Sequence, residues 1–218
     1  MEFQTLFPVW DALSGAERER ISAAAQLRTV PKGTLIHGGG AECTGLLLVK
    51  SGQLRAFILS DEGREVTIYR LFERDLCLFS AGCIMNSIQF DISIEAEKDC
   101  TYYLISPSVY RALMQENAAV ANFTNEVMGT RFSEVMWLVE QVMWKSLDKR
   151  LAAFLLDEAA IEGTNVLRLT HDALAAHLGT QREVVTRMLR YFKAEGMVEL
   201  RRGTVELTEI RKLRALSE

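Results

Sequence analysis

Hydrophobic and polar positions follow a strand-like pattern in the first half of this chain. Between Thr29 and about Ile105, short β-rich runs alternate with turn residues such as Ser51-Gly52 and Asp61-Glu62-Gly63. Runs of this length, separated by Gly, Ser and Asp, are typical of antiparallel strands joined by tight turns. The pattern predicts about eight strands in a small barrel or jelly roll.

Helical patterns flank these strands. Ser14 followed by Glu17 gives a capping-box pattern at the start of a short amphipathic helix, which we expect to cover the strands. Ser106-Pro107 supplies an N-cap and a first-turn proline, and this predicts a second short helix that ends near Gln115.

A long helical stretch from about Asn117 to Met143 carries two apolar stripes. The first repeats about every 3.5 residues and contains Val120, Val127, Val135, Leu138 and Val142; the second contains Phe123, Phe132, Met136, Val139 and Met143. One stripe can pack on the strands of the same chain, which leaves the other for a partner helix, and we assign the first stripe to the partner. The alternative is a helix buried on both sides within one chain.

The C-terminal third predicts helices and a hairpin. An amphipathic helix over 145–161 ends before Gly163. Between Leu169 and Gly196, two helices are joined by a tight glycine turn, the pattern of a helix-turn-helix that reads DNA. The residues expected to pack these two helices together are Leu174, Ala175, Leu178, Val185, Met188, Leu189 and Phe192. Short strands around Arg202-Gly203 then predict the wing of a winged helix-turn-helix.

The formal net charge of −4 conceals an uneven distribution. From Asn165 onward there are ten Lys or Arg and seven Asp or Glu, whereas the residues before it contain fifteen and twenty-two. The C-terminal region therefore has a charge of about +3 and the rest of about −7. A positive excess beside the helical pair favours a nucleic acid as partner, although it is also typical of a solvated face.

Composition restricts the class of protein. A hydrophobic content of 49% supports one large or two small globular domains. Apolar runs such as Leu46 to Val49 are too short to span a bilayer, and the first residues lack the pattern of a secretory signal. The four cysteines, Cys43, Cys77, Cys83 and Cys100, contain no CxxC pair. We therefore expect a cytoplasmic protein with no zinc site, disulfide framework or membrane association.

Two stretches carry a family resemblance. Residues 45–71, G-L-L-L-V-K-S-G-Q-L-R-A-F-I-L-S-D-E-G-R-E-V-T-I-Y-R-L, resemble the β-roll core of the Crp/Fnr bacterial transcription regulators, typified by the cAMP receptor protein and FNR. Residues 178–187, L-G-T-Q-R-E-V-V-T-R, resemble the turn and recognition helix of that family. The order of β-roll, long helix and winged helix-turn-helix extends the resemblance over nearly the whole chain.

The resemblance implies an α+β fold with three parts. Residues 1–116 would form a β-roll effector domain with an N-terminal helix, 117–144 a dimerisation helix and 145–218 a winged helix-turn-helix. It further implies a homodimer that binds a pseudo-palindromic, TGTGA-like DNA site, contacts RNA polymerase and responds to an unidentified small effector. No enzymatic activity is expected.

The recognition helix presents polar residues at the end expected to enter the major groove. Arg182 and Arg187 can each donate two hydrogen bonds to guanine, Glu183 can accept one from cytosine, and Thr186 can touch a thymine methyl. We expect Arg190 to contact phosphate or solvent, and Thr180 and Gln181 to contact the DNA backbone.

Other residues of this motif have less specific interpretations. Thr180 and Glu183 also match a capping box, in which case Glu183 would bond to its own helix. His171 and His177 are most simply surface or packing residues.

The effector pocket departs from the nucleotide-binding pattern of the family. Where relatives that bind cAMP carry Gly-Glu and Arg-Ser, this chain has Leu78-Phe79 and about Phe90-Asp91. A phenylalanine cannot neutralise phosphate and an aspartate would repel it, so we do not expect cAMP to bind. No cysteine precedes Cys43 and only His37 precedes His171, which disfavours iron-sulfur and haem variants, and no cofactor is expected.

The apolar segment 75–91 offers a different signal site. Its candidate pocket residues are Cys77, Phe79, Cys83 and Met85, which could hold a small apolar or aromatic effector. Cys77 and Cys83 could instead sense oxidation. The simpler alternative is that all four are packing residues.

Two other functions are alternatives to sequence-specific DNA binding. A cupin-like metal oxygenase would need clustered His and carboxylate ligands, and the strand-rich region contains His37 alone. A ligand-binding or partner-binding β-roll adaptor that does not read DNA specifically is the second rival. The polar residues spaced after Gly179 favour DNA reading over both.

Overall fold

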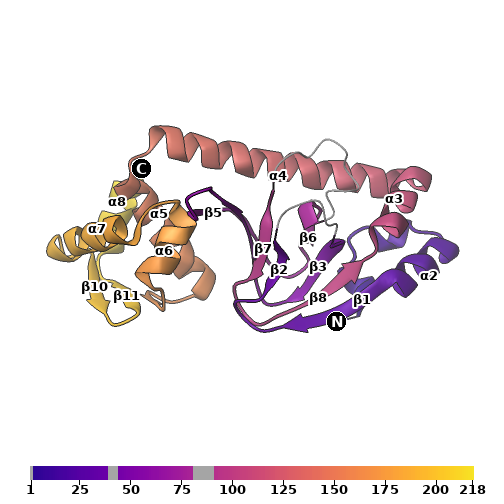
Figure 1. Ribbon diagram of the computed structural model, residues 1–218, viewed down its shortest axis with the longest axis horizontal. Coiled ribbons are helices and arrows are strands. Elements are labelled where there is room, and N and C mark those ends of the chain that lie inside the picture. Colours follow the sequence, from indigo (N-terminus) through magenta and orange to yellow (C-terminus); the bar gives the residue numbers. More distant parts are fainter. Residues whose placement is uncertain (1, 39–43, 81–90) are drawn as a thin grey trace. The chain divides into compact units, whose positions relative to one another are not determined.

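The computed structural model describes residues 2–38, 44–80 and 91–218 (Figure 1). Its contacts divide the chain into two compact units. The first contains residues 1–58 and 68–135, and the second contains residues 59–67 and 136–218. Cys83 and Met85, two of the predicted pocket residues, lie outside the described residues.

Short helices open the chain, strands follow them, and two further helices come after the strands. In chain order the elements up to residue 144 are α1 (Phe3–Leu6), η1 (Trp10–Ala12), α2 (Gly15–Ala24), β1 (Ala25–Val30), β2 (Leu35–Gly38), β3 (Leu46–Ser51), β4 (Leu54–Leu59), β5 (Glu65–Leu71), β6 (Leu76–Cys77), β7 (Ser93–Ala96), β8 (Cys100–Ile105), α3 (Pro107–Glu116) and α4 (Ala118–Trp144). Among the described residues, the strands of this part form two four-stranded sheets, ordered β1-β8-β3-β6 and β2-β7-β4-β5. Strand β8 pairs antiparallel with β1 and β3, and β7 pairs antiparallel with β2 and β4, as expected of a β-roll.

Strand β3 is buried on both faces. Leu46 and Leu48 belong to a core shared with the N-terminal helices, whereas Leu47 and Val49 belong to a second core between the sheets. Successive side chains of a strand point to opposite faces, so a strand with two buried faces needs an uninterrupted apolar run. The run Leu46 to Val49 therefore marks the centre of the first unit.

The predicted helix starts are confirmed. Ser14 accepts a hydrogen bond from the Glu17 backbone N–H at 3.4 Å, and Glu17 accepts one from the Ser14 N–H at 2.7 Å, which completes the capping box of α2. Ser106 is the N-cap of α3 and Pro107 is its first residue. Because Pro lacks an N–H and has a fixed φ, it fits the first turn without loss.

A winged helix-turn-helix makes up most of the second unit. Its elements are α5 (Leu147–Glu162), β9 (Val166–Leu167), α6 (His171–Leu178), α7 (Arg182–Ala194), β10 (Val198–Arg201), β11 (Thr204–Leu207) and α8 (Ile210–Ser217). The sheet order is β10-β11-β9, and Arg202-Gly203 forms the predicted two-residue turn between β10 and β11. The sequence patterns predicted nothing after Thr208, yet α8 places Leu213 in the same core. The α+β fold predicted from the resemblance is confirmed.

Gly179 occupies a crowded left-handed position after α6. Its φ is +67°, and a Cβ atom added there would lie 2.4 Å from Cγ2 of Val66, which belongs to the same unit. Gly163 ends α5 at φ +65° with nothing within 4 Å. The two glycines therefore share a backbone conformation and differ in the space around them.

Alanine at these two glycines is expected to have unequal costs. Gly163→Ala should lower the free energy of unfolding by about 1 kcal/mol, the cost of a left-handed L-residue. Gly179→Ala should lower it by about 1 to 3 kcal/mol more, because Val66 must move. Urea unfolding of both variants measures the difference, and Val66→Ala should recover part of the loss at Gly179. Equal losses at the two glycines would show that Val66 does not crowd the turn.

Candidate nucleic-acid interface

The turn between α6 and α7 is fixed by local bonds. Thr170 caps α6 by accepting a hydrogen bond from the Ala173 N–H at 3.1 Å, and Gly179 ends this helix in the left-handed region. The Arg150 guanidinium, from α5, donates to the carbonyl oxygen of Leu178 at the last turn of α6. Burial lowers the pKa of Arg150 from its ordinary value. A cation at this end of a helix also complements the helix dipole.

Helix α7 has one apolar face and one polar face. Val185, Leu189 and Phe192 are fully buried in the core of the unit, in agreement with the helix packing expected from the sequence. The candidate readers Arg182, Glu183 and Arg187 are exposed, as is Arg190, and Thr186 is half-buried. The first two turns of α7 therefore present two cations, an acid and a hydroxyl-bearing side chain.

The capping box that Thr180 and Glu183 offered as an alternative is not formed at the start of α7. The helix begins at Arg182 with Gln181 as its N-cap, and no side chain bonds to the cap. Thr180 precedes the cap in the turn, where its N–H donates to Ala175 O at 3.1 Å. Glu183 is therefore the second residue of the helix and lies on its exposed side, so the capping interpretation of this carboxylate is wrong.

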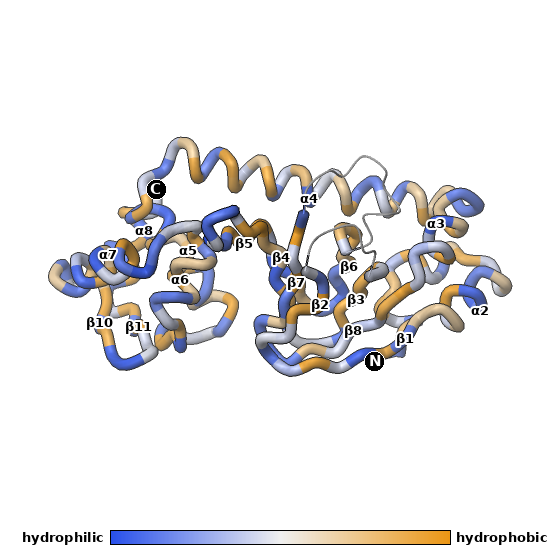
Figure 2. Tube along the Cα trace, viewed as in Figure 1, coloured by the Kyte–Doolittle hydropathy of each residue, from blue (hydrophilic) through white to orange (hydrophobic). Residues whose placement is uncertain are grey.

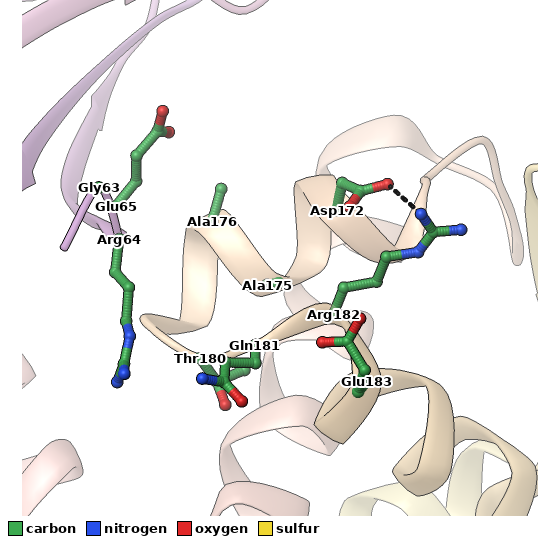
Figure 3. A pocket seen from close by; sticks show the side chains of 10 residues that line it. All are labelled: Gly63, Arg64, Glu65, Asp172, Ala175, Ala176, Thr180, Gln181, Arg182 and Glu183. Atoms are coloured by element: carbon green, nitrogen blue, oxygen red, sulfur yellow. Dashed lines mark ion pairs between the residues drawn. The ribbon is translucent and has the colours of Figure 1, made fainter.

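An open pocket of about 440 Å³ lies beside the start of α7 (Figure 3). Its lining consists of Gly63, Arg64, Glu65, Asp172, Ala175, Ala176, Thr180, Gln181, Arg182 and Glu183, all within the second unit. Arg182 and Asp172 form an ion pair across it at 3.6 Å, with both side chains more than half exposed. Exposed pairs of this kind contribute little stability, so Arg182 can be drawn away from Asp172 by a stronger partner.

The sequence patterns did not predict the contacts of Asp172 and His171 with two of the candidate DNA-reading residues. Asp172 pairs with Arg182, and the His171 ring nitrogen Nδ1 lies 2.8 Å from Oγ1 of Thr186. Both contacts join the start of α6 to the start of α7. His177, by contrast, is buried, stacks on Phe154 and bonds to Thr67, and so is a packing residue.

The wing carries its own charges. Lys193 and Glu199 form an ion pair at 2.9 Å, and the hydrogen bond from Lys193 lowers the pKa of the Glu199 carboxyl. Arg201 pairs with Glu206 at 3.4 Å, and Arg202 is exposed in the turn. The wing thus adds a cation at its tip to those of α7.

Helix α4 divides its apolar residues differently from the prediction. Val120 is 0% exposed in the core of the first unit and Val127 packs against that core, so Val120 cannot reach a partner helix. Val135 and Leu138 are half-buried, and of the predicted set only Val142 is exposed. The assignment of the whole first stripe to a partner is therefore corrected.

Most of the second stripe is exposed. Its exposed members are Phe132, Met136, Val139 and Met143, separated by four, three and four residues. This is the spacing of a heptad seam, and apolar bands recur along α4 (Figure 2). Phe123, the remaining member, packs against the core of the first unit.

The described effector-pocket candidates lie in an apolar core. Cys77 is 1% exposed and Phe79 is buried among the side chains between the sheets. The Tyr69 hydroxyl lies 3.6 Å from Cys77 Sγ, and the Tyr69 and Phe79 ring centroids are 5.8 Å apart. Burial raises the pKa of Tyr69 well above its ordinary value. These contacts agree with the packing alternative for Cys77 and Phe79.

Cys77 and Cys100 are expected to be unreactive in the folded protein. Both are buried free thiols, and burial raises the pKa of Cys100 to about 11. At pH 8 only about one Cys100 thiol in a thousand is then ionised, and the thiolate is the reactive form. In a Cys43→Ser/Cys83→Ser variant, a disulfide reagent should label neither thiol before guanidinium is added. Rapid labelling of the native variant would instead support a redox role for these two residues.

Two general properties of the described ranges bear on function. Within residues 2–38, 44–80 and 91–218, no helix has both the length and the apolar character needed to cross a bilayer. In the same ranges, His, Cys, Asp and Glu side chains do not gather in groups of three that could hold a metal ion.

A β-roll followed by a long helix and a winged helix-turn-helix with an exposed cationic reading face defines a class of DNA-binding transcription regulators. Comparison with protein families agrees: residues 27–117 match a cyclic nucleotide-binding domain, and residues 149–216 match a Crp-like helix-turn-helix domain. The chain belongs to the Crp/Fnr family of transcription regulators.

Individual relatives give the same result. A protein from Eubacterium rectale, assigned to the crp/fnr family of transcriptional regulators, has a crystal structure with 57% sequence identity and a TM-score of 0.95, covering 98% of this chain and 99% of that chain. The cyclic AMP receptor protein of Thermus thermophilus is 28% identical over 93% of each chain. The c-di-GMP responsive regulator CLP of Xanthomonas campestris shares the fold, with 21% identity and a TM-score of 0.76 over 89% of this chain and 99% of its own.

Proposed function

We propose that this Crp/Fnr regulator acts as a homodimer on a pseudo-palindromic DNA site and is controlled by a signal other than cyclic AMP. The observation that carries the proposal is that the recognition helix α7 has two faces. Leu189 lies on its buried face, and Arg182 and Arg187 lie on its exposed face. A helix held this way can place its first two turns in a major groove.

The readers divide into base contacts and backbone contacts. Arg182 and Arg187 are assigned to guanine, Glu183 to cytosine and Thr186 to thymine, according to the hydrogen-bonding groups that each base presents in the major groove. Arg190, Thr180 and Gln181 are assigned to the DNA backbone, where they position the protein without specifying sequence. Arg182, Glu183 and Arg187 are exposed, which supports their availability to a DNA partner.

The second apolar stripe of α4 supports a parallel pair of helices in the dimer. Phe132 is 67% exposed and Met143 is 64% exposed, and side chains of this size are rarely left in contact with water along an entire helix face. A twofold axis along this stripe would bring two copies of Met136 and Val139 together. Dimerisation would then present two recognition helices to half-sites about 34 to 36 Å apart.

The proposed signal is a small molecule or a redox change. Leu78 and Phe79, which stand where cAMP-binding relatives carry Gly-Glu, are buried apolar side chains and offer no carboxylate to a ribose. Asp91 is exposed near the place expected for the phosphate-binding Arg-Ser pair. The burial of Cys77 favours a small molecule over oxidation at this thiol. RNA polymerase is the further partner that the family implies.

Selection from a randomised DNA duplex tests the proposal. The protein should enrich sequences with two inverted, TGTGA-like half-sites whose centres lie one helical turn apart. A recovered pool without inverted symmetry would contradict the dimer, and a pool with no enrichment would favour the adaptor that does not read DNA specifically.

A further inference from the structure

The hydroxyl group of Thr186 is engaged on both of its hydrogen-bonding sides. Oγ1 lies 2.8 Å from the carbonyl oxygen of Arg182, one turn earlier in α7, and 2.8 Å from Nδ1 of His171 in α6. A hydroxyl has one proton, and a carbonyl oxygen can only accept. Thr186 must therefore donate to Arg182, which leaves its oxygen to accept from His171.

The two hydrogen bonds of Thr186 determine which ring nitrogen of His171 carries a hydrogen. For the 2.8 Å contact to be a hydrogen bond, Nδ1 must carry the hydrogen and donate it to Oγ1 of Thr186. The hydrogen on Nδ1 is the one consistent with both bonds of the Thr186 hydroxyl. Two bonds from different helices then hold the Thr186 side chain in one rotamer.

Because the Thr186 hydroxyl already donates its hydrogen within the protein, Thr186 has no donor left for DNA. Its only proton is already donated to Arg182, so it cannot donate to an acceptor on a base edge. The group left for recognition is the γ-methyl. In the major groove, the feature that matches a methyl group is the C5-methyl of thymine.

We propose that His171 is a specificity-determining residue of the DNA interface. It acts as a positioning residue: by holding the hydroxyl of Thr186, it makes Thr186 recognise thymine through its methyl group. This inference rests on the proposed function, in which α7 enters the major groove. It assigns a reading role to the first helix of the motif, which the sequence pattern had treated as support alone.

The test compares thymine with deoxyuridine, which lacks only the C5-methyl group. In the selected site, each thymine is replaced in turn in both half-sites, and affinity is measured by titration at fixed salt. At one position the wild-type protein should lose about fourfold per half-site, the amount expected for one buried methyl group. Thr186→Ser keeps the hydroxyl and removes the methyl, so it should show no loss at that position.

Two substitutions at His171 separate positioning from other roles. His171→Ala removes the donor, and the deoxyuridine penalty should fall below twofold while Thr186 keeps its methyl group. His171→Asn restores an N–H near the place of Nδ1, and the penalty should return to about fourfold. Thermal unfolding of each variant, followed by circular dichroism, confirms that the winged helix-turn-helix is folded before affinities are compared.

The outcomes are distinguishable. If His171→Ala weakens thymine and deoxyuridine sites equally, His171 contacts only the phosphate backbone and the inference is overturned. The inference is also overturned if deoxyuridine weakens binding of the wild-type protein at no thymine position, while that protein still prefers the selected site over a scrambled duplex. A wild-type protein with no such preference would overturn the proposed function itself.

Discussion

Glutamate at both Met136 and Val139 is expected to dissociate the proposed dimer and to weaken binding to a palindromic site at least 100-fold. These residues lie in the exposed seam of α4 between Phe132 and Met143. In a twofold dimer the change would bury four carboxylates against one another, and unpaired buried charge is strongly unfavourable. Once the protein is monomeric, each recognition helix binds alone and loses the about 100- to 10,000-fold gain from linked sites.

Sedimentation equilibrium and a DNA titration together test this expectation. The matched control places glutamates at Thr130 and Ser133, which have the same three-residue spacing and are exposed polar positions of the same helix. The control should remain dimeric and bind the palindrome within about threefold of wild type, because exposed substitutions away from packed surfaces have small effects. A Met136→Glu/Val139→Glu variant that sediments as the wild-type dimer would show that this seam is not the interface.

Arg187→Ala is expected to lower the affinity for the selected site by about 1 to 3 kcal/mol, which is roughly 5- to 150-fold. The loss on random duplex should be smaller. Arg187 is exposed on α7, and in the proposed complex its guanidinium can donate two hydrogen bonds to O6 and N7 of one guanine. Removing this contact should also relax the base preference at one position of each half-site.

Arg187→Lys is the matched control for charge. Lysine keeps the positive charge and loses the planar pair of donors, so it should retain affinity for random duplex and lose much of the preference for the selected site. Arg190→Ala should instead weaken both duplexes by similar factors, since a phosphate contact carries no sequence information. Equal losses on both duplexes for Arg187→Ala would show that Arg187 only neutralises charge.

Local signals in the sequence were sufficient for most of the fold. The capping box at Ser14 and Glu17, the proline at 107 and the glycine at 163 each act within one helical turn, and each marks a helix end in the structure. At α7 the local signal is ambiguous, because Thr180 and Glu183 match a capping box although Gln181 is the N-cap. Tertiary packing of the turn decides between two adjacent candidates of this kind.

The two stripes of α4 show a different limit. Periodicity gives the angle between side chains around a helix, but it does not say which neighbour each face meets. Val120 and Phe132 are both large apolar residues, and only the folded unit shows that the first is buried and the second is 67% exposed. The N-terminal members of both stripes, Val120 and Phe123, meet the core of the first unit, and Val142 of the first stripe is exposed, so neither stripe keeps one neighbour along its length.

The reading surface was predictable in part. The apolar spacing of Val185, Leu189 and Phe192 marks the buried face of α7, so the polar residues between them could be expected on the exposed side. The bond from His171 to Thr186 joins residues fifteen positions apart on two helices. No local pattern marks such a contact, since it depends on the angle at which the glycine turn sets α7 against α6.

The ratio of dissociation constants for the selected palindrome and a scrambled duplex of equal length tests the central claim most directly. Both constants must be measured at one salt concentration, since phosphate contacts alone make affinity depend on salt. A regulator that reads sequence should prefer the palindrome by about 1,000-fold or more. A ratio near one, with the same dependence on salt for both duplexes, would show that α7 binds phosphates without reading bases.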